Sequence, residues 1–221
     1  MLVTDGEARR RPGRPQAPVL TRDRITRVAL QLAERRGHRA LTVDALAREL
    51  AVSKSALYNH AASKATLFVW MQDAINATID TSAFATTDWS TAVTAWARSY
   101  REAYARYPQL VPLMATQPIA DAPRTAAMYE AVARGLVAGG WDVADVLNVV
   151  VAVEAFVFGA ALDIGAPDDI FDARSASDEA PTIASAVDAR AARHGVGRDA
   201  ADAAFELGLA ALLDGLAARR G

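Results

Sequence analysis

Two short amphipathic helices separated by three residues are predicted within the segment 41–64, LTVDALARELAVSKSALYNHAASK. Thr42 is typical of a residue that caps a helix, and the second helix is expected from about Lys54 to His60, after a break at residues 51–53. The apolar residues that would hold the two helices at a steep angle are Val43, Leu46, Leu50, Val52 and Leu57. The pattern predicts a helix-turn-helix whose second helix leaves its polar side chains exposed.

Two further short helices are expected on either side of this segment. Thr21 can cap a helix that ends at Gly37, and Ser63 can cap a fourth helix that continues beyond residue 67. None of the four is long enough to bury its apolar face alone, so they must pack on one another. We therefore expect a compact three-helix domain over residues 21–67, continued by the fourth helix into a second domain over residues 68–221.

Charge is distributed unevenly between these two parts of the chain. Residues 1–67 hold 13 Lys and Arg against 6 Asp and Glu, a net charge of +7, whereas residues 68–221 hold 11 against 20, a net charge of −9. Both lysines of the chain, Lys54 and Lys64, lie in the helix-turn-helix segment. A basic domain joined to an acidic one suggests a polyanionic partner for the first domain alone.

The first 20 residues combine arginine with proline and glycine and show no apolar period, which predicts a flexible basic arm. The run RRRPGRP at residues 9–15 is similar to arms that insert arginine into narrow A·T-rich minor grooves. A basic tail with no fixed role is an equally good interpretation of these residues.

The rest of the chain is predicted to be helical throughout, so the protein is expected to be all-α. No stretch shows the alternation of a strand, and the evident loops are the Gly139–Gly140 turn and the polar stretch 165–181. The expected helices span residues 91–107, 109–115, 124–137, 142–163 and 199–219.

Composition excludes several classes of protein. The chain has no cysteine, which excludes disulfide scaffolds and cysteine nucleophiles, and its three histidines form no close-spaced ligand pair, so we expect neither a metal nor another cofactor. The apolar stretch 143–162 contains Asp145, Asn148 and Glu154, which would be costly inside a bilayer. We therefore interpret it as a buried helix of a soluble protein. No apolar run follows the N-terminal arginines, so we expect neither a signal peptide nor a membrane anchor, and a cytoplasmic protein with no membrane partner.

The pattern LTxxxLAxxLxVSxxxLYxHxxSKxxL, which begins at Leu41, resembles the DNA-binding signature of the TetR family of bacterial transcriptional regulators. The resemblance implies that the second helix of the pair enters the major groove of double-stranded DNA. By position it implies three residues at base edges: Lys54, Ser55 and Asn59. It implies four residues at the phosphate backbone: Thr42, Tyr58, His60 and Lys64.

Two positions depart from the family pattern. Ala51 stands where the family usually has glycine, and a left-handed alanine costs about 1 kcal/mol. Ala61 stands where many relatives have phenylalanine, so the packing between the third and fourth helices is expected to be looser or to be rebuilt by Phe68. Neither departure removes an implied DNA contact.

Residues 89–163 also resemble the effector domain of the tetracycline-repressor branch of that family, through the segment 107–113 and the Gly-Gly-Trp turn at 139–141. In that branch a histidine coordinates a drug-bound magnesium ion; Leu113 stands at that position here and cannot bind a metal. Aromatic residues at helical spacing are typical of a core, and with polar tips they are also typical of a small-molecule pocket. The candidate ligand-binding residues are Trp96, Tyr100, Thr116, Gln117, Tyr129, Phe156 and Asp163.

Glu154 is the one acidic residue in the middle of the apolar helix 142–163. If it is buried, it must be paired or protonated. A partner in the same helix, a partner in a second subunit and a ligand remain alternatives.

Two C-terminal helices carry more apolar surface than one small domain can cover. The helix over residues 199–219 has its own apolar stripe, and helix 142–163 is apolar on nearly every side. We expect these helices to pair with a second copy in a twofold four-helix interface. Such a homodimer would present two reading helices to successive major grooves and prefer a near-palindromic operator.

These observations lead to one leading hypothesis and two alternatives. The chain is expected to be a homodimeric repressor, not an enzyme, released from its operator by a small, largely apolar effector. The first alternative is a helical-bundle enzyme that uses Glu154, Asp163 or His60 on a small metabolite. The second is a protein that coats DNA without sequence preference.

Overall fold

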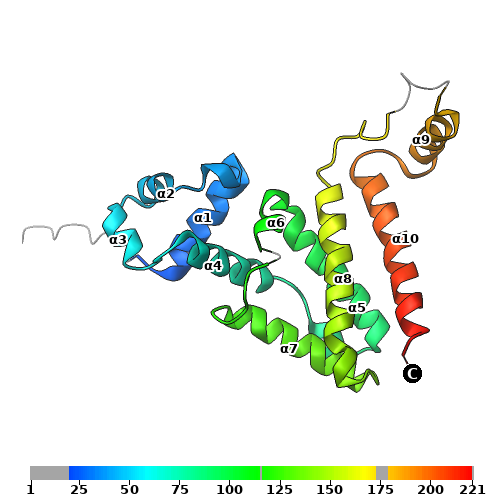
Figure 1. The fold of residues 1–221 in the computed structure, drawn as a ribbon, viewed down its shortest axis with the longest axis horizontal. Coiled ribbons are helices and arrows are strands. Elements are labelled where there is room, and N and C mark those ends of the chain that lie inside the picture. Colours follow the sequence, from blue (N-terminus) through cyan, green and yellow to red (C-terminus); the bar gives the residue numbers. More distant parts are fainter. Residues whose placement is uncertain (1–19, 115, 173–178, 221) are drawn as a thin grey trace, which may run out of the picture.

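The computed structural model describes residues 20–114, 116–172 and 179–220, and the described residues contain helices and no β-strand. The all-α prediction is therefore confirmed for this part of the chain. The predicted basic arm lies outside the described residues, apart from Leu20. Figure 1 shows a smaller group of helices at the N-terminal end, joined by one helix to a larger C-terminal group.

The N-terminal group consists of three helices and a short 3-10 turn. They are α1 (Arg22–Arg36), η1 (His38–Ala40), α2 (Val43–Leu50) and α3 (Lys54–Tyr58). Each α-helix begins at a side-chain cap: Thr21 Oγ1 accepts from the backbone N–H of Arg24 at 3.2 Å, and the residues that do the same for α2 and α3 are Thr42 and Ser53. These caps satisfy N–H groups that have no partner within the helix, which is why the helices begin where the sequence predicts.

The fourth helix, α4 (Lys64–Asn76), connects the two groups. It begins at Ser63, as predicted, and it packs against α1 on one side and α7 (Pro123–Ala138) on the other. Its core-facing residues are buried whether they are apolar or polar: Leu67, Phe68, Met71, Gln72, Asp73, Ile75 and Asn76. A helix that is buried against both groups is suited to transmit a movement from one to the other.

The C-terminal group is built around α5 (Trp89–Ala105) and α8 (Val143–Asp163), which pack on each other along their lengths. The short elements beside them are η2 (Ser82–Ala85), η3 (Pro108–Leu110) and α6 (Val111–Met114). The last helix, α10 (Arg198–Ala217), packs against α8 and α5 (Figure 1). Each predicted helix is present here, with boundaries that differ by a few residues; the largest difference is the 3-10 start of the segment at Pro108.

The helix α8 is buried on one side and exposes apolar residues on another, as expected for a helix that is apolar on nearly every side. It is long and apolar enough to cross a membrane, a property that it shares with core helices of soluble proteins. Its inner residues are buried against α5, α7 and α10, but Val143, Leu147 and Val151 are 73%, 70% and 61% exposed. These three residues recur every four positions and so form an apolar strip on one side of the helix.

One helix was not predicted at all, namely α9 (Pro181–His194). It packs against α10, and none of its residues is buried. Ile183, Val187 and Ala191 recur every four residues along it and line a groove, so a short apolar stripe is present that the prediction missed.

Candidate functional site

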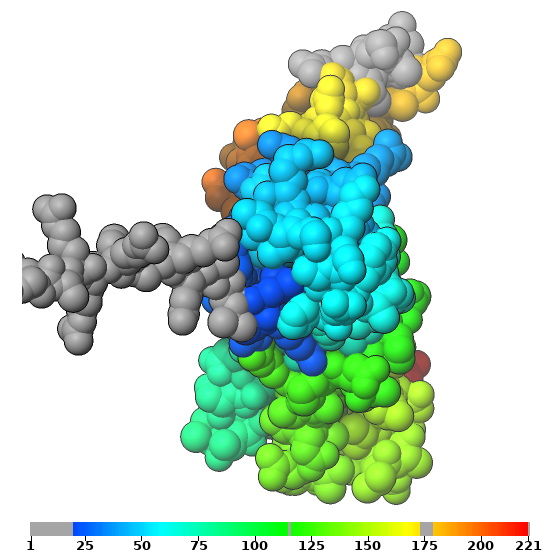
Figure 2. Space-filling view, turned by 90° about the vertical axis from the view of Figure 1, so that its left-hand side faces the viewer, coloured from blue at the N-terminus to red at the C-terminus, as the bar shows by residue number. Residues whose placement is uncertain are grey.

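The residues predicted to touch DNA lie on one exposed surface of the N-terminal group. Figure 2 shows residues of α2 and α3, in light blue and cyan, on the upper middle part of one face, above the green residues of the C-terminal group. All seven predicted side chains are exposed, and the side chain of Tyr58 is 52% accessible in spite of its size. Leu57, by contrast, is buried in the core of this group. The third helix therefore presents polar groups outward and is held by an apolar residue inward, as a reading helix requires.

The turn between α2 and α3 sets the angle of the reading helix. Ala51 has φ 55° and ψ 43°, and its backbone N–H donates to the carbonyl of Arg48 at 3.1 Å. It is the only non-glycine residue with positive φ among the described residues. Ala51 is therefore left-handed, at a cost of about 1 kcal/mol relative to the glycine that the family usually has there.

An ion pair links the two helices at this surface. The ammonium group of Lys54 lies 2.5 Å from Oδ1 of Asp44, and both side chains remain more than half exposed. The other lysine, Lys64, lies at the start of α4 with its ammonium group 5.5 Å from the centre of the Phe68 ring. Thr42 uses its hydroxyl as a helix cap, accepting from the backbone N–H of Ala45 at 3.1 Å.

A hollow of about 270 Å³ lies beneath three of the predicted DNA contacts. It is lined by Ala61 and by Thr42, Tyr58 and Lys64, above a floor of apolar residues: Leu41, Val43, Leu46, Leu57 and Leu67. Phe68 is not among the lining residues, so it does not fill the space. Of the two outcomes expected from alanine at position 61, the structure shows the looser packing.

A buried polar cluster occupies the centre of the C-terminal group. The hydroxyls of Tyr100 on α5 and Tyr129 on α7 both donate to Oε1 of Glu154 on α8, at 2.8 Å and 2.5 Å. Tyr100 is 1% exposed and stacks on Tyr104, with ring centres 5.1 Å apart. Trp96 meets Tyr100 edge to face and keeps its buried indole N–H without a partner.

This environment shifts the titration of the cluster. Burial raises the pKa of the Glu154 carboxyl, although the hydroxyls of Tyr129 and Tyr100 act in the opposite direction. Burial and the charge of Glu154 together raise the pKa of Tyr129 far above its ordinary value. Glu154 therefore has its partners within its own chain, on two other helices, and the hydroxyl protons stay on the tyrosines at neutral pH.

The other predicted effector residues lie elsewhere. Phe156 stacks on Phe205 of α10 with ring centres 5.5 Å apart, and a Cβ at Gly208 would be only 2.6 Å from its ring, so it packs at the α8–α10 junction. Thr116 is exposed, and Gln117 lines a hollow of about 660 Å³ that it shares with Arg22 of α1. The structure brings together only Trp96, Tyr100 and Tyr129 of the predicted set.

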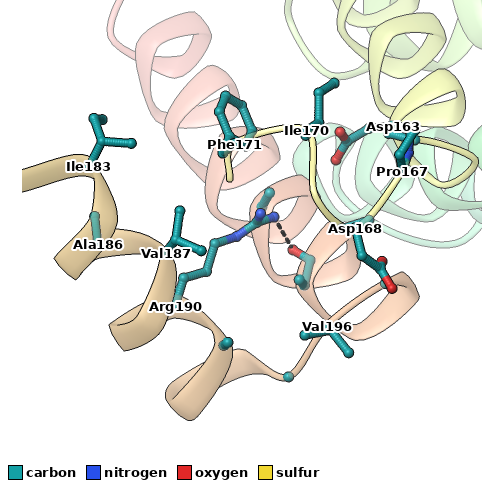
Figure 3. A pocket seen from close by; sticks show the side chains of 17 residues that line it. Asp163, Pro167, Asp168, Ile170, Phe171, Ile183, Ala186, Val187, Arg190 and Val196 are labelled. Carbon is teal, nitrogen blue, oxygen red and sulfur yellow. Dashed lines mark hydrogen bonds between the residues drawn. The ribbon is translucent and has the colours of Figure 1, made fainter. Parts of the chain in front are cut away.

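Asp163 lies in a different hollow, a groove of about 490 Å³ between the end of α8, α9 and the start of α10. Figure 3 shows this groove, with its apolar side chains Ile170, Phe171, Ile183 and Val187 and the guanidinium of Arg190, which donates to the carbonyl of Ala200 at 3.0 Å. The residues proposed for an enzyme are also apart: His60 lies just after α3, Glu154 lies within α8, and Asp163 lies at its end.

A second buried carboxylate, which the sequence did not single out, joins the two groups of helices. Asp73 on α4 is 3% exposed; its Oδ2 lies 3.0 Å from Nη2 of Arg22 on α1. Its Oδ1 accepts from the backbone N–H groups of Arg124 at 2.8 Å and Thr125 at 3.0 Å, at the start of α7. The residue that precedes α7, Ala122, provides no side-chain cap, so Asp73 supplies that cap from another helix.

The same face of α4 connects this carboxylate to the tyrosine cluster. Asn76, one turn beyond Asp73, donates to the hydroxyl of Thr125 at 3.2 Å and accepts from the hydroxyl of Tyr104 at 2.8 Å. Tyr104 in turn stacks on Tyr100. The available signal was the occurrence of Gln72, Asp73 and Asn76 in an otherwise apolar helix, but the sequence does not show which partners they meet.

Two family models match the chain and together cover most of it. The model described as bacterial regulatory proteins, tetR family, matches residues 25–70, and the model described as tetracyclin repressor-like, C-terminal domain, matches residues 84–220. The first range contains the helix-turn-helix and the second contains the tyrosine cluster.

Individual proteins give the same result. The chain is 33% identical over 203 residues to the class A tetracycline repressor protein from transposon 1721 of Escherichia coli, which covers 89% of this chain and 90% of that protein. A possible TetR family regulator from Streptomyces coelicolor superposes with a TM-score of 0.76 at 27% identity, over 90% of this chain and 100% of that one.

Two further relatives have been solved in complex with another molecule, one with a drug and one with DNA. A TetR variant from Acinetobacter baumannii in complex with minocycline has a TM-score of 0.68 at 26% identity, over 92% of this chain and 99% of that one. BioQ of Mycobacterium smegmatis has a TM-score of 0.65 at 26% identity, over 90% and 99% of the two chains. BioQ has also been solved with its natural double-stranded DNA operator, at 25% identity to this chain.

Proposed function

Because the chain belongs to the TetR family of bacterial transcriptional regulators, we propose that it is a homodimeric repressor released from a near-palindromic operator by a small, largely apolar effector. Membership of the family makes it a DNA-binding regulator of transcription. The observation that carries the proposal is the exposed polar surface of α3, held in place by a capped and packed helix-turn-helix.

The proposed DNA contacts follow from the positions on this surface. The base-reading residues are Lys54, Ser55 and Asn59, all exposed on α3 or directly after it. The residues proposed to hold the phosphate backbone are Thr42, Tyr58, His60 and Lys64, all likewise exposed. The net charge of +7 over residues 1–67 supports binding to a polyanion, and the operator complex of BioQ supports double-stranded DNA as that polyanion.

The proposed dimer uses the apolar strip of α8. Val143, Leu147 and Val151 are exposed on that helix, and Leu207 is 75% exposed on the neighbouring α10. An exposed apolar strip on one helix with an exposed apolar residue on its neighbour is typical of a four-helix interface between two copies. Twofold symmetry would place the two α3 helices in successive major grooves and explains a preference for a near-palindromic operator.

The proposed effector site is the cluster around Glu154. Trp96, Tyr100 and Tyr129 supply aromatic walls, and the unpartnered indole N–H of Trp96 and the Glu154 carboxyl supply polar groups. The minocycline complex of a relative supports a small-molecule effector. The remaining predicted residues, Thr116, Gln117, Phe156 and Asp163, lie outside this cluster.

The proposed signal travels along α4. A ligand that displaces Tyr100 would disturb its stacking partner Tyr104, whose hydroxyl bonds to Asn76 on α4. One turn away, Asp73 holds Arg22 of the DNA-binding domain. A shift of α4 would change the separation of the two reading helices. Affinity for DNA would then fall by an amount set by how much more tightly the effector binds the DNA-free conformation than the DNA-bound one.

The DNA-binding part is tested by fluorescence anisotropy on a duplex that the wild-type protein selects from a random pool. Lys64→Ala should weaken binding to every duplex and reduce the slope of log affinity against log salt by about 0.9, since one phosphate contact is lost. Asn59→Ala should instead change which base is preferred at one position of each half-site. Arg134→Ala, on the exposed face of α7, is the control and should change neither.

The effector part is tested by thermal unfolding with a panel of hydrophobic compounds, with minocycline as the first probe, both with and without Mg²⁺. A bound compound should raise the melting temperature of the wild type and lower its affinity for the selected duplex. Tyr129→Phe keeps the ring but loses the hydroxyl near Glu154, and should weaken both effects. A wild-type protein that shows no preference for any duplex over random DNA would contradict the proposed function.

A further inference from the structure

An acidic side chain stands at the edge of the surface proposed to meet DNA. Asp44 lies in the first turn of α2, two residues after the cap Thr42, and its Oδ1 is 2.5 Å from the ammonium group of Lys54, the first residue of α3. The two side chains are 57% and 61% exposed. The pair therefore joins the two helices at the outer surface of the helix-turn-helix and not in its core.

This pair has no evident purpose in stability or in DNA affinity. Exposed ion pairs contribute little to the free energy of unfolding, because water screens the charges and both side chains lose freedom. A carboxylate near phosphates repels them and lowers affinity. Its position in the first turn of α2 favours the helix dipole, but Thr42 already caps that helix. The presence of Asp44 at this surface therefore needs a reason that involves Lys54.

We propose that Asp44 is a specificity-determining residue that acts through Lys54. When no guanine lies opposite α3, the Asp44 carboxylate pairs with the Lys54 ammonium group. When the operator places a guanine there, Lys54 leaves Asp44 and binds the guanine. This inference rests on the proposed function, because it requires α3 to lie against base edges. Asp44 itself touches no base; it is a positioning residue.

The physical basis is a competition for one ammonium group. On random DNA, Lys54 stays paired with Asp44, so the pair carries no net charge and releases no counterion from the phosphates. On the operator, O6 and N7 of a guanine present two acceptors in the major groove, and a contact of this kind discriminates against other bases by between about fivefold and about a hundredfold. The exposed pair is weak enough to be exchanged for such a contact. Asp44 thus lowers binding to the wrong sequence more than binding to the right one.

The test compares two duplexes of equal length, one selected from a random pool by the wild-type protein and one of random sequence. In Asp44→Asn the freed Lys54 can bind a phosphate, so affinity for the random duplex should rise about threefold to tenfold at low salt, with a salt slope steeper by about 0.9. Affinity for the selected duplex should rise less, so the ratio of the two affinities should fall. Asp44→Glu should restore the ratio, since the longer carboxylate can still reach Lys54.

Two controls separate this role from a general effect of charge. In a Lys54→Met background, Asp44→Asn should change both affinities by the same factor, because no ammonium group is left to be released. Glu49→Gln removes the same charge from the same helix; Glu49 pairs with Arg35 of α1 at 3.3 Å, away from α3. It should also change both affinities equally.

The inference is overturned if Asp44→Asn leaves the ratio of the two affinities unchanged, whether or not the affinities themselves move. It is also overturned if the ratio falls to the same extent without Lys54. If the wild-type protein does not distinguish the selected duplex from random DNA, the proposed function itself is contradicted, and not only the role of Asp44. Thermal melts of each variant confirm that the domain remains folded.

Discussion

Asp73 of α4 and Arg22 of α1 form a partly buried ion pair that joins the connecting helix to the DNA-binding group, with 3.0 Å between Oδ2 and Nη2. The carboxylate is almost completely buried, and its second oxygen caps the start of α7 through the backbone of Arg124 and Thr125. One side chain therefore fixes the relative positions of three helices that are distant in the sequence. Arg22 is further oriented by the Trp70 ring, 5.3 Å from its guanidinium carbon.

Replacement of Asp73 should destabilise the whole chain. Asp73→Asn keeps the size of the side chain but loses the charge that attracts Arg22 and weakens the bonds to the two N–H groups of α7. Since little water can reach the site, we expect the free energy of unfolding to fall by about 1–3 kcal/mol. Urea denaturation measures this change. Asp23→Asn is the control, because Asp23 is exposed and pairs with Arg124 at 3.5 Å; equal losses in the two variants would contradict the role of Asp73.

The stability of the chain should depend on pH through Glu154. Burial raises the pKa of its carboxyl above the ordinary value of 4.5, so the folded chain holds this proton more tightly than the unfolded chain. The resulting contribution to stability is fully present below the unfolded pKa and is lost as pH rises through the folded pKa. Glu154→Gln removes this loss, so the variant should gain in unfolding free energy relative to the wild type as the pH rises above about 4.5.

Urea titrations at several pH values measure this difference. Glu130→Gln, on the exposed face of α7, serves as the control and should differ from the wild type by a constant amount. A constant difference for Glu154→Gln as well would show that the carboxyl titrates normally in the folded chain.

The hollow beside Ala61 should accept a larger apolar side chain. Ala61→Leu adds three carbon atoms to a space bounded by four leucines, and it should raise the free energy of unfolding by about 1–2 kcal/mol. Ala62→Leu places the same group on an exposed neighbour and should change stability little. Chemical denaturation of both variants provides the measurement. A loss of stability in Ala61→Leu would mean that the hollow is closed in solution.

The oligomeric state should depend on the apolar strip of α8. Leu147→Asp places a charge in the middle of the proposed four-helix interface, where it would lose its water without gaining a partner, and it should convert dimers to monomers. Analytical ultracentrifugation at micromolar concentration distinguishes the two states. Ile119→Asp, at a comparably apolar but separate exposed position before α7, should leave the dimer intact. The interface is elsewhere if Leu147→Asp sediments like the wild type.

Local signals in the chain were sufficient to predict most of the helices. A cap such as Thr42 bonds to a backbone group three residues away, and an apolar stripe repeats every three or four residues. Both signals therefore lie within a few residues of sequence and can be predicted from it. The seven residues proposed to contact DNA could be named for the same reason: they belong to one short motif. The helix α9 was missed because its apolar stripe is short and none of its residues is fully buried.

The C-terminal site could not be predicted in the same way, because its residues meet across large separations along the chain. Tyr100 reaches Glu154 over 54 residues, and Arg22 reaches Asp73 over 51. The candidates Phe156 and Asp163 share a helix with Glu154, yet they face α10 and a separate groove. Which face of a helix meets which neighbour depends on how the helices cross.

The amino-acid order thus settled the class of fold, the helix-turn-helix and the division of charge, since each is a property of adjacent residues and their short-range bonds. The three-dimensional packing alone decided that Glu154 is held by two tyrosines, that Asp73 clamps two helix groups, and that Asp44 pairs with Lys54. The physical reason is that a hydrogen bond or an ion pair depends on distances of a few ångströms between side chains, and only the folded backbone sets those distances.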